Sequence, residues 1–129
     1  MAKSELPKPT DAELAILRVL WERGPSTVRD VTDALLAERG TGYTTALKLM
    51  QIMTEKGLVR RDVSARTHVY EAVAPPEETQ RQLVGELLER AFGGCTQQLV
   101  VQALATRKAS AQELAEIRKI LDELEKNAK

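Results

Sequence analysis

Hydroxyl, amide and amino side chains recur at helical spacing in the middle of the chain. On a helix of about 3.6 residues per turn, Thr44, Lys48 and Gln51 lie on one side, with Thr45 beside them. A lysine can bind a phosphate or guanine, a glutamine amide can make two hydrogen bonds to adenine, and a threonine can contact a thymine methyl group. These residues suit contacts with DNA, although a solvated face of an ordinary surface helix has the same composition.

The other side of the same segment is apolar. Ala46, Met50 and Met53 fall largely opposite the polar residues and are expected to face a core. Tyr43, at the start of the segment, is open to two interpretations, a contact with DNA backbone or base at the helix N-terminus and no contact at all. The segment is therefore predicted to be a two-faced helix whose polar side binds DNA.

Positive charge is concentrated beside this helix. Nineteen basic and nineteen acidic residues cancel over the 129-residue chain, which argues against a protein that coats nucleic acid indiscriminately. Residues 39–66 hold six basic and two acidic side chains, a local charge of +4, whereas the charge from residue 75 onward is −1. Arg60, Arg61, Arg66 and His68 are predicted to contact DNA, with a merely solvated strand position as the alternative for His68.

Local signals divide the first part of the chain into three short helices. A capping box in TDAE starts the first helix at Thr10, and Gly24 followed by proline ends it. Ser26 or Thr27 caps the second helix. The third helix is predicted over residues 43–56 and ends at a glycine.

Two β-forming segments follow the third helix. Leu58-Val59 and Val69-Tyr70 flank a turn at Ser64-Ala65-Arg66 and predict a hairpin, with Tyr70 in the core. Three helices followed by a hairpin is the order of a winged helix-turn-helix, whose third helix can enter the major groove. We therefore expect a mainly α fold, a winged helix-turn-helix followed by an all-helical dimerisation region.

Pro75-Pro76 marks the boundary between these regions, because proline stiffens the backbone and can begin a helix. We predict a winged-helix DNA-binding domain over residues 1–74 and a helical dimerisation domain over residues 75–129, with a further capping box at Ser110. Such short helices can hardly bury their apolar stripes alone, so a homodimer is expected; the alternative is that the stripes fold back on the first domain. The residues predicted to dimerise are Leu83, Leu87, Leu88, Phe92, Leu99, Leu104, Leu114, Ile117, Leu121 and Leu124.

Residue types argue against an enzyme, a metal site and a bound cofactor. One cysteine, Cys95, and one histidine, His68, offer no metal-ligand spacing and no internal disulfide. The chain lacks a Gly-rich phosphate loop, GxSxG and HExxH. We expect Cys95 to be an inert structural thiol rather than a redox group. Without a long apolar run, a cytoplasmic protein with no membrane insertion is expected.

Four segments in order resemble the penicillinase repressor family of BlaI/MecI type. They are TDAELAILRVLWERGPSTVRDV, GYTTALKLMQIMTEKGLV, RTHVYEAVAPPEE and a later GG before a Leu/Val-rich helix, and the similarity runs from about Leu6 to Leu124. The resemblance implies a homodimeric repressor that binds double-stranded operator DNA at an inverted repeat of TACA/TGTA type and blocks a promoter. It implies that the C-terminal helices intertwine, and that the controlled genes include β-lactamase or other antibiotic- and stress-response genes.

In β-lactamase systems of this family, a membrane sensor-protease triggers cleavage of the repressor within its dimerisation domain. The resemblance places that region at Val101, Gln102 and Ala103, where the sequence departs from the Asn-Phe of the staphylococcal members. A second departure is Ile52, where related members often carry arginine, so operator preference can differ. One branch of the family senses copper through a cysteine-rich C-terminal tail; LDELEKNAK contains no cysteine, so copper sensing by that device is not expected.

The alternative function is a protein-interaction module, in which the winged helix is a scaffold without operator-specific repression. The +4 charge of residues 39–66 separates the two hypotheses. A scaffold has no need to concentrate cations beside its third helix, so the charge favours DNA binding.

Overall fold

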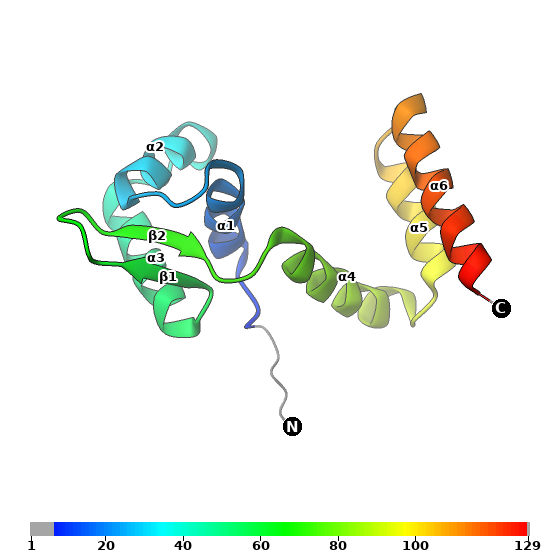
Figure 1. The fold of residues 1–129 in the computed structure, drawn as a ribbon, viewed down its shortest axis with the longest axis horizontal. Coiled ribbons are helices and arrows are strands. Elements are labelled where there is room, and N and C mark those ends of the chain that lie inside the picture. Colours follow the sequence, from blue (N-terminus) through cyan, green and yellow to red (C-terminus); the bar gives the residue numbers. More distant parts are fainter. Residues whose placement is uncertain (1–6, 129) are drawn as a thin grey trace, which may run out of the picture. The chain divides into compact units, whose positions relative to one another are not determined.

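The structure is a computed structural model that describes residues 7–128 (Figure 1). Within that range the helices are α1 (Asp11–Arg23), α2 (Val28–Arg39), α3 (Tyr43–Lys56), α4 (Pro76–Phe92), α5 (Thr96–Thr106) and α6 (Ala111–Asn127), and the strands are β1 (Val59–Asp62) and β2 (Val69–Ala72). The predicted fold class, three helices and a hairpin followed by further helices, is confirmed. None of these described helices is both long and apolar enough to cross a membrane.

Reciprocal hydrogen bonds begin the first two helices. Thr10 Oγ1 accepts from the Glu13 amide, and the Glu13 carboxylate accepts from the Thr10 amide, which completes the predicted capping box. Thr27, and not Ser26, caps α2 through a second complete box with Asp30. Caps of this kind satisfy amides that a helix start leaves without partners, so these few residues determine where α1 and α2 begin.

The end of α3 depends on one glycine. Gly57 has a φ of 87°, in the left-handed region that other residues rarely adopt, and its amide donates to the carbonyls of Met53 and Thr54. The next amide, that of Leu58, also donates to the Met53 carbonyl, at 2.9 Å. This turn directs the chain out of α3 and into β1.

One apolar core joins α1, α2, α3 and the hairpin. Ile16, Val31 and Met50 are fully buried, and Tyr70 is buried as predicted. The strands pair antiparallel with Val59 opposite Ala72. Because the core takes side chains from all three helices and both strands, it holds α3 in place relative to the hairpin.

The loop between α1 and α2 adds a short strand-like pairing to the hairpin. The Ser26 amide donates to the Tyr70 carbonyl at 2.9 Å, and the Tyr70 amide donates to the Ser26 carbonyl at 2.8 Å. The sequence indicated Ser26 as a possible cap of α2, but its backbone instead fixes β2 beside the start of that helix.

Helix α4 begins at Pro76, as predicted, and its first turns pack with the winged helix. The chain divides into two compact units, residues 1–85 and residues 86–129. Within the first unit, Trp21 Nε1 donates to the Ala74 carbonyl at 3.0 Å, and Thr79 of α4 is buried. The functional division into residues 1–74 and 75–129 stays a prediction.

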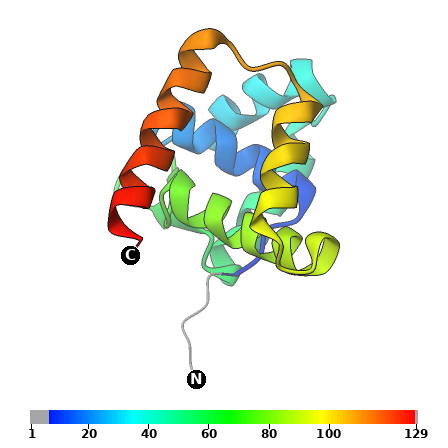
Figure 2. The same ribbon diagram turned by 90° about the vertical axis from the view of Figure 1, so that its right-hand side faces the viewer.

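The second unit has no buried residue in α5 or α6. Figure 2 shows that these two helices are connected by residues 107–110 and do not pack closely against each other. At the start of α6, Ser110 Oγ accepts from the Glu113 amide at 3.0 Å, which is the hydroxyl half of the predicted capping box. The apolar side chains of this unit thus lack a shared core within one chain.

Candidate nucleic-acid interface

Helix α3 has the two faces that the sequence predicts. Ala46, Met50 and Met53 are each 0% exposed and pack in the core. The polar positions that point away from the core, here called the reading face, are Thr44, Thr45, Lys48 and Gln51, and all four are exposed. Because the opposite side of α3 packs in the core, the reading face points to solvent. There it is accessible to a ligand as large as double-stranded DNA.

The N-terminus of α3 is open to an anion. Its capping residue, Gly42, has no side chain that could accept a hydrogen bond from the first-turn amides. Uncapped amides at a helix start, together with the helix dipole, favour a phosphate or carboxylate. Tyr43 is the first residue of α3 and is 45% exposed, so its side chain is accessible at this end of the helix.

Arg29 of α2 is a candidate contact residue that the sequence analysis missed. Its guanidinium carbon lies 5.3 Å from the centre of the Tyr43 ring, within cation–π range. The aromatic ring thereby holds a cation beside the start of α3. The helix-turn-helix order could have indicated this residue, because the helix before the recognition helix crosses the DNA backbone in that motif.

The tip of the wing, meaning the β1–β2 hairpin with its loop, lies beside the same place. Arg66 and His68 line an open hollow of about 290 Å³ together with Thr27, Arg29 and Tyr43. We call this the wing hollow. The wing hollow is lined by residues from the start of α2, the start of α3 and the wing. Its cationic side chains can bind phosphate oxygens.

Arg60 and Arg61 lie elsewhere on the wing. The Nε and Nη2 atoms of Arg60 donate to Glu71 Oε2 at 3.1 and 2.8 Å, across the two strands. Arg60 and Arg61 line a second open hollow with Asp62, not the wing hollow. Both arginines are exposed, but the structure does not bring them next to Tyr43.

Lys56, at the end of α3, is also engaged within the protein. Its Nζ lies 2.7 Å from Glu13 Oε1, which is the carboxylate of the α1 capping box. Burial raises the pKa of Glu13, but the Lys56 ammonium and the hydrogen bonds from Lys56 and Thr10 outweigh it and hold the pKa below its ordinary value. The pair ties the C-terminal end of α3 to the start of α1 and removes one cation from those available to DNA.

The residues predicted for dimerisation are distributed unevenly over the two units. Leu83 lies in the first unit, against α1, whereas the others lie in the second unit. The exposed members are Leu87, Leu104, Leu114, Leu121 and Leu124, and the partly buried ones are Leu88, Phe92, Leu99 and Ile117. The predicted cleavage region, Val101, Gln102 and Ala103, is exposed and lies inside α5.

Comparison with known proteins identifies the family. The sequence profile described as Penicillinase repressor matches residues 9–123 of the chain. The chain belongs to the penicillinase repressor family. Two relatives named "Transcriptional regulator BlaI", from Mycobacterium tuberculosis strains CDC 1551 / Oshkosh and ATCC 25618 / H37Rv, are each 32% identical over 123 residues, which cover 95% of this chain and 88% of theirs. This family member is a transcriptional regulator and not an enzyme.

Solved structures share the fold of this penicillinase repressor family member. The solution structure of the DNA-binding domain of the repressor BlaI aligns with a TM-score of 0.51 at 20% identity, over 59% of this chain and 93% of that one. The monomeric form of Bacillus licheniformis BlaI in complex with the blaP half-operator aligns with a TM-score of 0.51 at 20% identity, over 57% and 90% of the two chains. The winged-helix fold is thereby confirmed.

Proposed function

We propose that the protein is a homodimeric transcriptional repressor that binds an inverted-repeat operator of TACA/TGTA type through α3 and the wing. The observation that carries this proposal is that α3 bears the exposed reading face and also lines the wing hollow, through Tyr43 at its start. Specific DNA binding needs groups for base edges and cations for phosphates on one surface. This surface offers both.

The reading face is assigned to the major groove. Lys48 can bind guanine or a phosphate, Gln51 can pair with adenine, and Thr44 and Thr45 can contact thymine or phosphate. Tyr43, Arg66 and His68 are assigned to the DNA backbone, and Arg29 joins them through its contact with Tyr43. Arg60 and Arg61 are assigned to DNA phosphates farther from α3. To bind a phosphate there, Arg60 must first break its ion pair with Glu71.

A DNA-bound relative supports this assignment. The fold of the first unit matches that of Bacillus licheniformis BlaI, whose monomeric form binds the blaP half-operator. One winged helix of that fold therefore engages half of an operator, and we extend the same division to this chain. Two protomers would then each read one half-site.

The second unit is proposed to hold two copies of the chain together. Leu87 is 50% exposed and Leu121 is 57% exposed, and no residue of α5 or α6 is buried. Exposed apolar faces of this extent mark an interaction surface. A second copy would cover them and place two recognition helices about 34–36 Å apart, one turn of DNA, or a multiple of it.

Induction is proposed to occur by proteolysis in α5. A membrane sensor-protease, or another inactivating protease, would act on the region of Val101, Gln102 and Ala103 in the cytoplasm, and the genes so released would include β-lactamase or other antibiotic- and stress-response genes. These residues are exposed but helical. A protease needs extended backbone, so α5 has to unfold locally before cleavage.

A footprint on the promoter region of the protein's own gene tests the proposal. We expect a protected dyad, and we expect Lys48→Ala or Gln51→Ala to weaken operator binding by about 1–3 kcal/mol per half-site. Lys108→Ala is the matched control, because Lys108 is an exposed cation between α5 and α6 and should leave binding unchanged. An unprotected promoter together with a monomeric elution volume would reject the proposal in favour of the protein-interaction module.

A further inference from the structure

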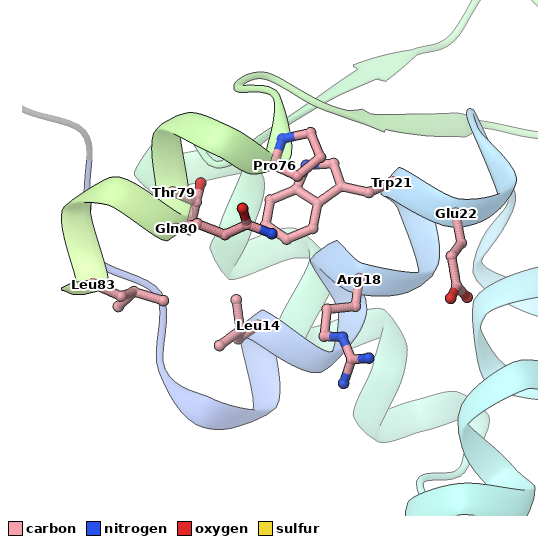
Figure 3. Close-up of a pocket in the computed structure, with 8 residues that line it drawn as sticks. All are labelled: Leu14, Arg18, Trp21, Glu22, Pro76, Thr79, Gln80 and Leu83. Carbon is pink, nitrogen blue, oxygen red and sulfur yellow. The ribbon is translucent and has the colours of Figure 1, made fainter. Parts of the chain in front are cut away.

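We infer that a groove between α1 and the first turns of α4 binds a small ligand with an apolar body and one carboxylate. The groove lies wholly within the first unit and has a volume of about 390 Å³ (Figure 3). Ligand sites in proteins typically measure about 300–1,000 Å³. The inference does not depend on operator binding, because none of the lining residues belongs to α3 or the wing.

The apolar walls of this α1–α4 groove are built in advance of any ligand. Leu14 and Leu83 point toward each other, and the Trp21 indole lies next to Pro76 and Gln80 (Figure 3). The hydrogen bond from the indole to the Ala74 carbonyl fixes the ring, and Leu14 and Trp21 pack against the core from behind. A ligand therefore finds a preformed surface and does not have to order flexible side chains.

The charge at the rim determines the class of ligand. Arg18 is exposed at the edge of the groove, and its guanidinium forms no ion pair with any residue between Pro7 and Ala128. An arginine can bind a carboxylate through two parallel hydrogen bonds. Glu22, one turn further along α1, also lines the groove and would repel a second acidic group. The combination favours a monocarboxylate over a dicarboxylate or a phosphate.

The groove has room for a small molecule. Its volume of about 390 Å³ lies near the lower end of the usual range for ligand sites. A single substituted ring is small enough to lie between Leu14 and Leu83, and Arg18 lines the same groove. Such a ligand would touch both α1 and α4 and would stabilise the first turns of α4 against the winged helix.

The single tryptophan of the chain provides the assay, because Trp21 lies in the groove wall. The probe is 4-tert-butylbenzoate, and the matched uncharged probe is 4-tert-butylbenzamide, each titrated into the full chain while Trp21 fluorescence is recorded. We expect a saturable change with the carboxylate and about tenfold weaker binding of the amide. The midpoint temperature of thermal unfolding should rise at a saturating concentration of the carboxylate probe, because a ligand that binds the folded state stabilises it.

Two variants separate this site from non-specific adsorption. Arg18→Gln should lower the affinity for the carboxylate to that for the amide, whereas Arg23→Gln, at the end of the same helix and outside the groove, should not. Gln80→Phe should fill the groove and abolish binding of both probes; Gln80 is exposed, so the fold should tolerate the change. The inference is overturned if binding does not saturate or if Arg18→Gln binds the carboxylate as tightly as the wild type. It is also overturned if the probe is displaced as the chain self-associates, because a second copy of the chain would then occupy the groove.

Discussion

Arg66 and Arg60 differ in what their guanidinium groups already bind. Arg66 lies at the wing hollow and has no ion pair among residues 7–128, whereas Arg60 donates twice to Glu71. If both were equal phosphate contacts, their removal would have equal effects. The structure predicts that Arg66→Ala weakens operator binding and makes it less sensitive to salt, and that Arg60→Ala does so much less.

The magnitude follows from counterion release. Each phosphate contact contributes about 0.9 to the slope of the logarithm of the association constant against the logarithm of the salt concentration. A dimer has two copies of Arg66, so Arg66→Ala should make the slope shallower by about 2. The affinity difference between wild type and Arg66→Ala should then narrow by about tenfold when the salt concentration rises about fourfold. Arg60→Ala should change the slope by less than about 1, because its cation is already neutralised by Glu71.

Fluorescence anisotropy with a labelled operator duplex, repeated over a salt series, measures all three slopes. Circular dichroism of each variant verifies that the winged helix is intact. Identical slopes for the wild type and Arg66→Ala would refute the assignment of Arg66 to a phosphate. Equal slope changes in the two variants would show that Glu71 does not withhold Arg60 from DNA.

Two further predictions concern residues that position this surface, and a third concerns the proposed contact between two chains. Glu13→Gln should cost about 1–3 kcal/mol of unfolding free energy at neutral pH, because Lys56 loses its charged acceptor. Since the pKa of Glu13 is lowered in the folded state, the stability that its carboxylate contributes is present above the ordinary carboxyl pKa and is lost as the pH falls through the folded-state pKa. Denaturant unfolding should therefore give equal free energies of unfolding for the wild type and Glu13→Gln in acid. Met50→Ala should cost about 2–5 kcal/mol, because Met50 is fully buried behind the reading face, and a smaller loss in urea titration would contradict the core placement. Leu121→Glu should convert a dimer to a monomer in sedimentation while the first unit stays folded, because Leu121 is 57% exposed within one chain; a persistent dimer would exclude Leu121 from the interface.

Helix ends and the faces of α3 were predictable from the sequence. The capping box at Thr10 and the glycine at position 57 act over a few residues, so the signal and the structure are close together in the chain. The periodicity of α3 likewise separates Ala46 and Met50 from Lys48 without any knowledge of their surroundings. The sequence could not decide between Ser26 and Thr27 as the cap of α2, because that choice depends on pairing of Ser26 with a distant strand.

The local charge of +4 overstated what the surface offers to DNA. Lys56 is held by Glu13, which lies 43 residues earlier in the chain, and Arg60 is held by Glu71 on the neighbouring strand. Arg29 lies outside residues 39–66 and was not counted, yet it lies over Tyr43. A sum along the sequence counts charges, but only their positions in space show which of them are neutralised.

By itself, then, the sequence determined the order of the elements, the two faces of α3 and the family, because each of these rests on patterns within short segments. The tertiary structure decided which cations meet at the wing hollow, how Ser26 pairs with Tyr70, and where α1 and α4 leave a groove. It also decided that the apolar faces of α5 and α6 lie uncovered within one chain. The physical reason is that an apolar stripe or a charge has the same sequence pattern whether or not a distant residue covers it, and only the fold brings that residue near.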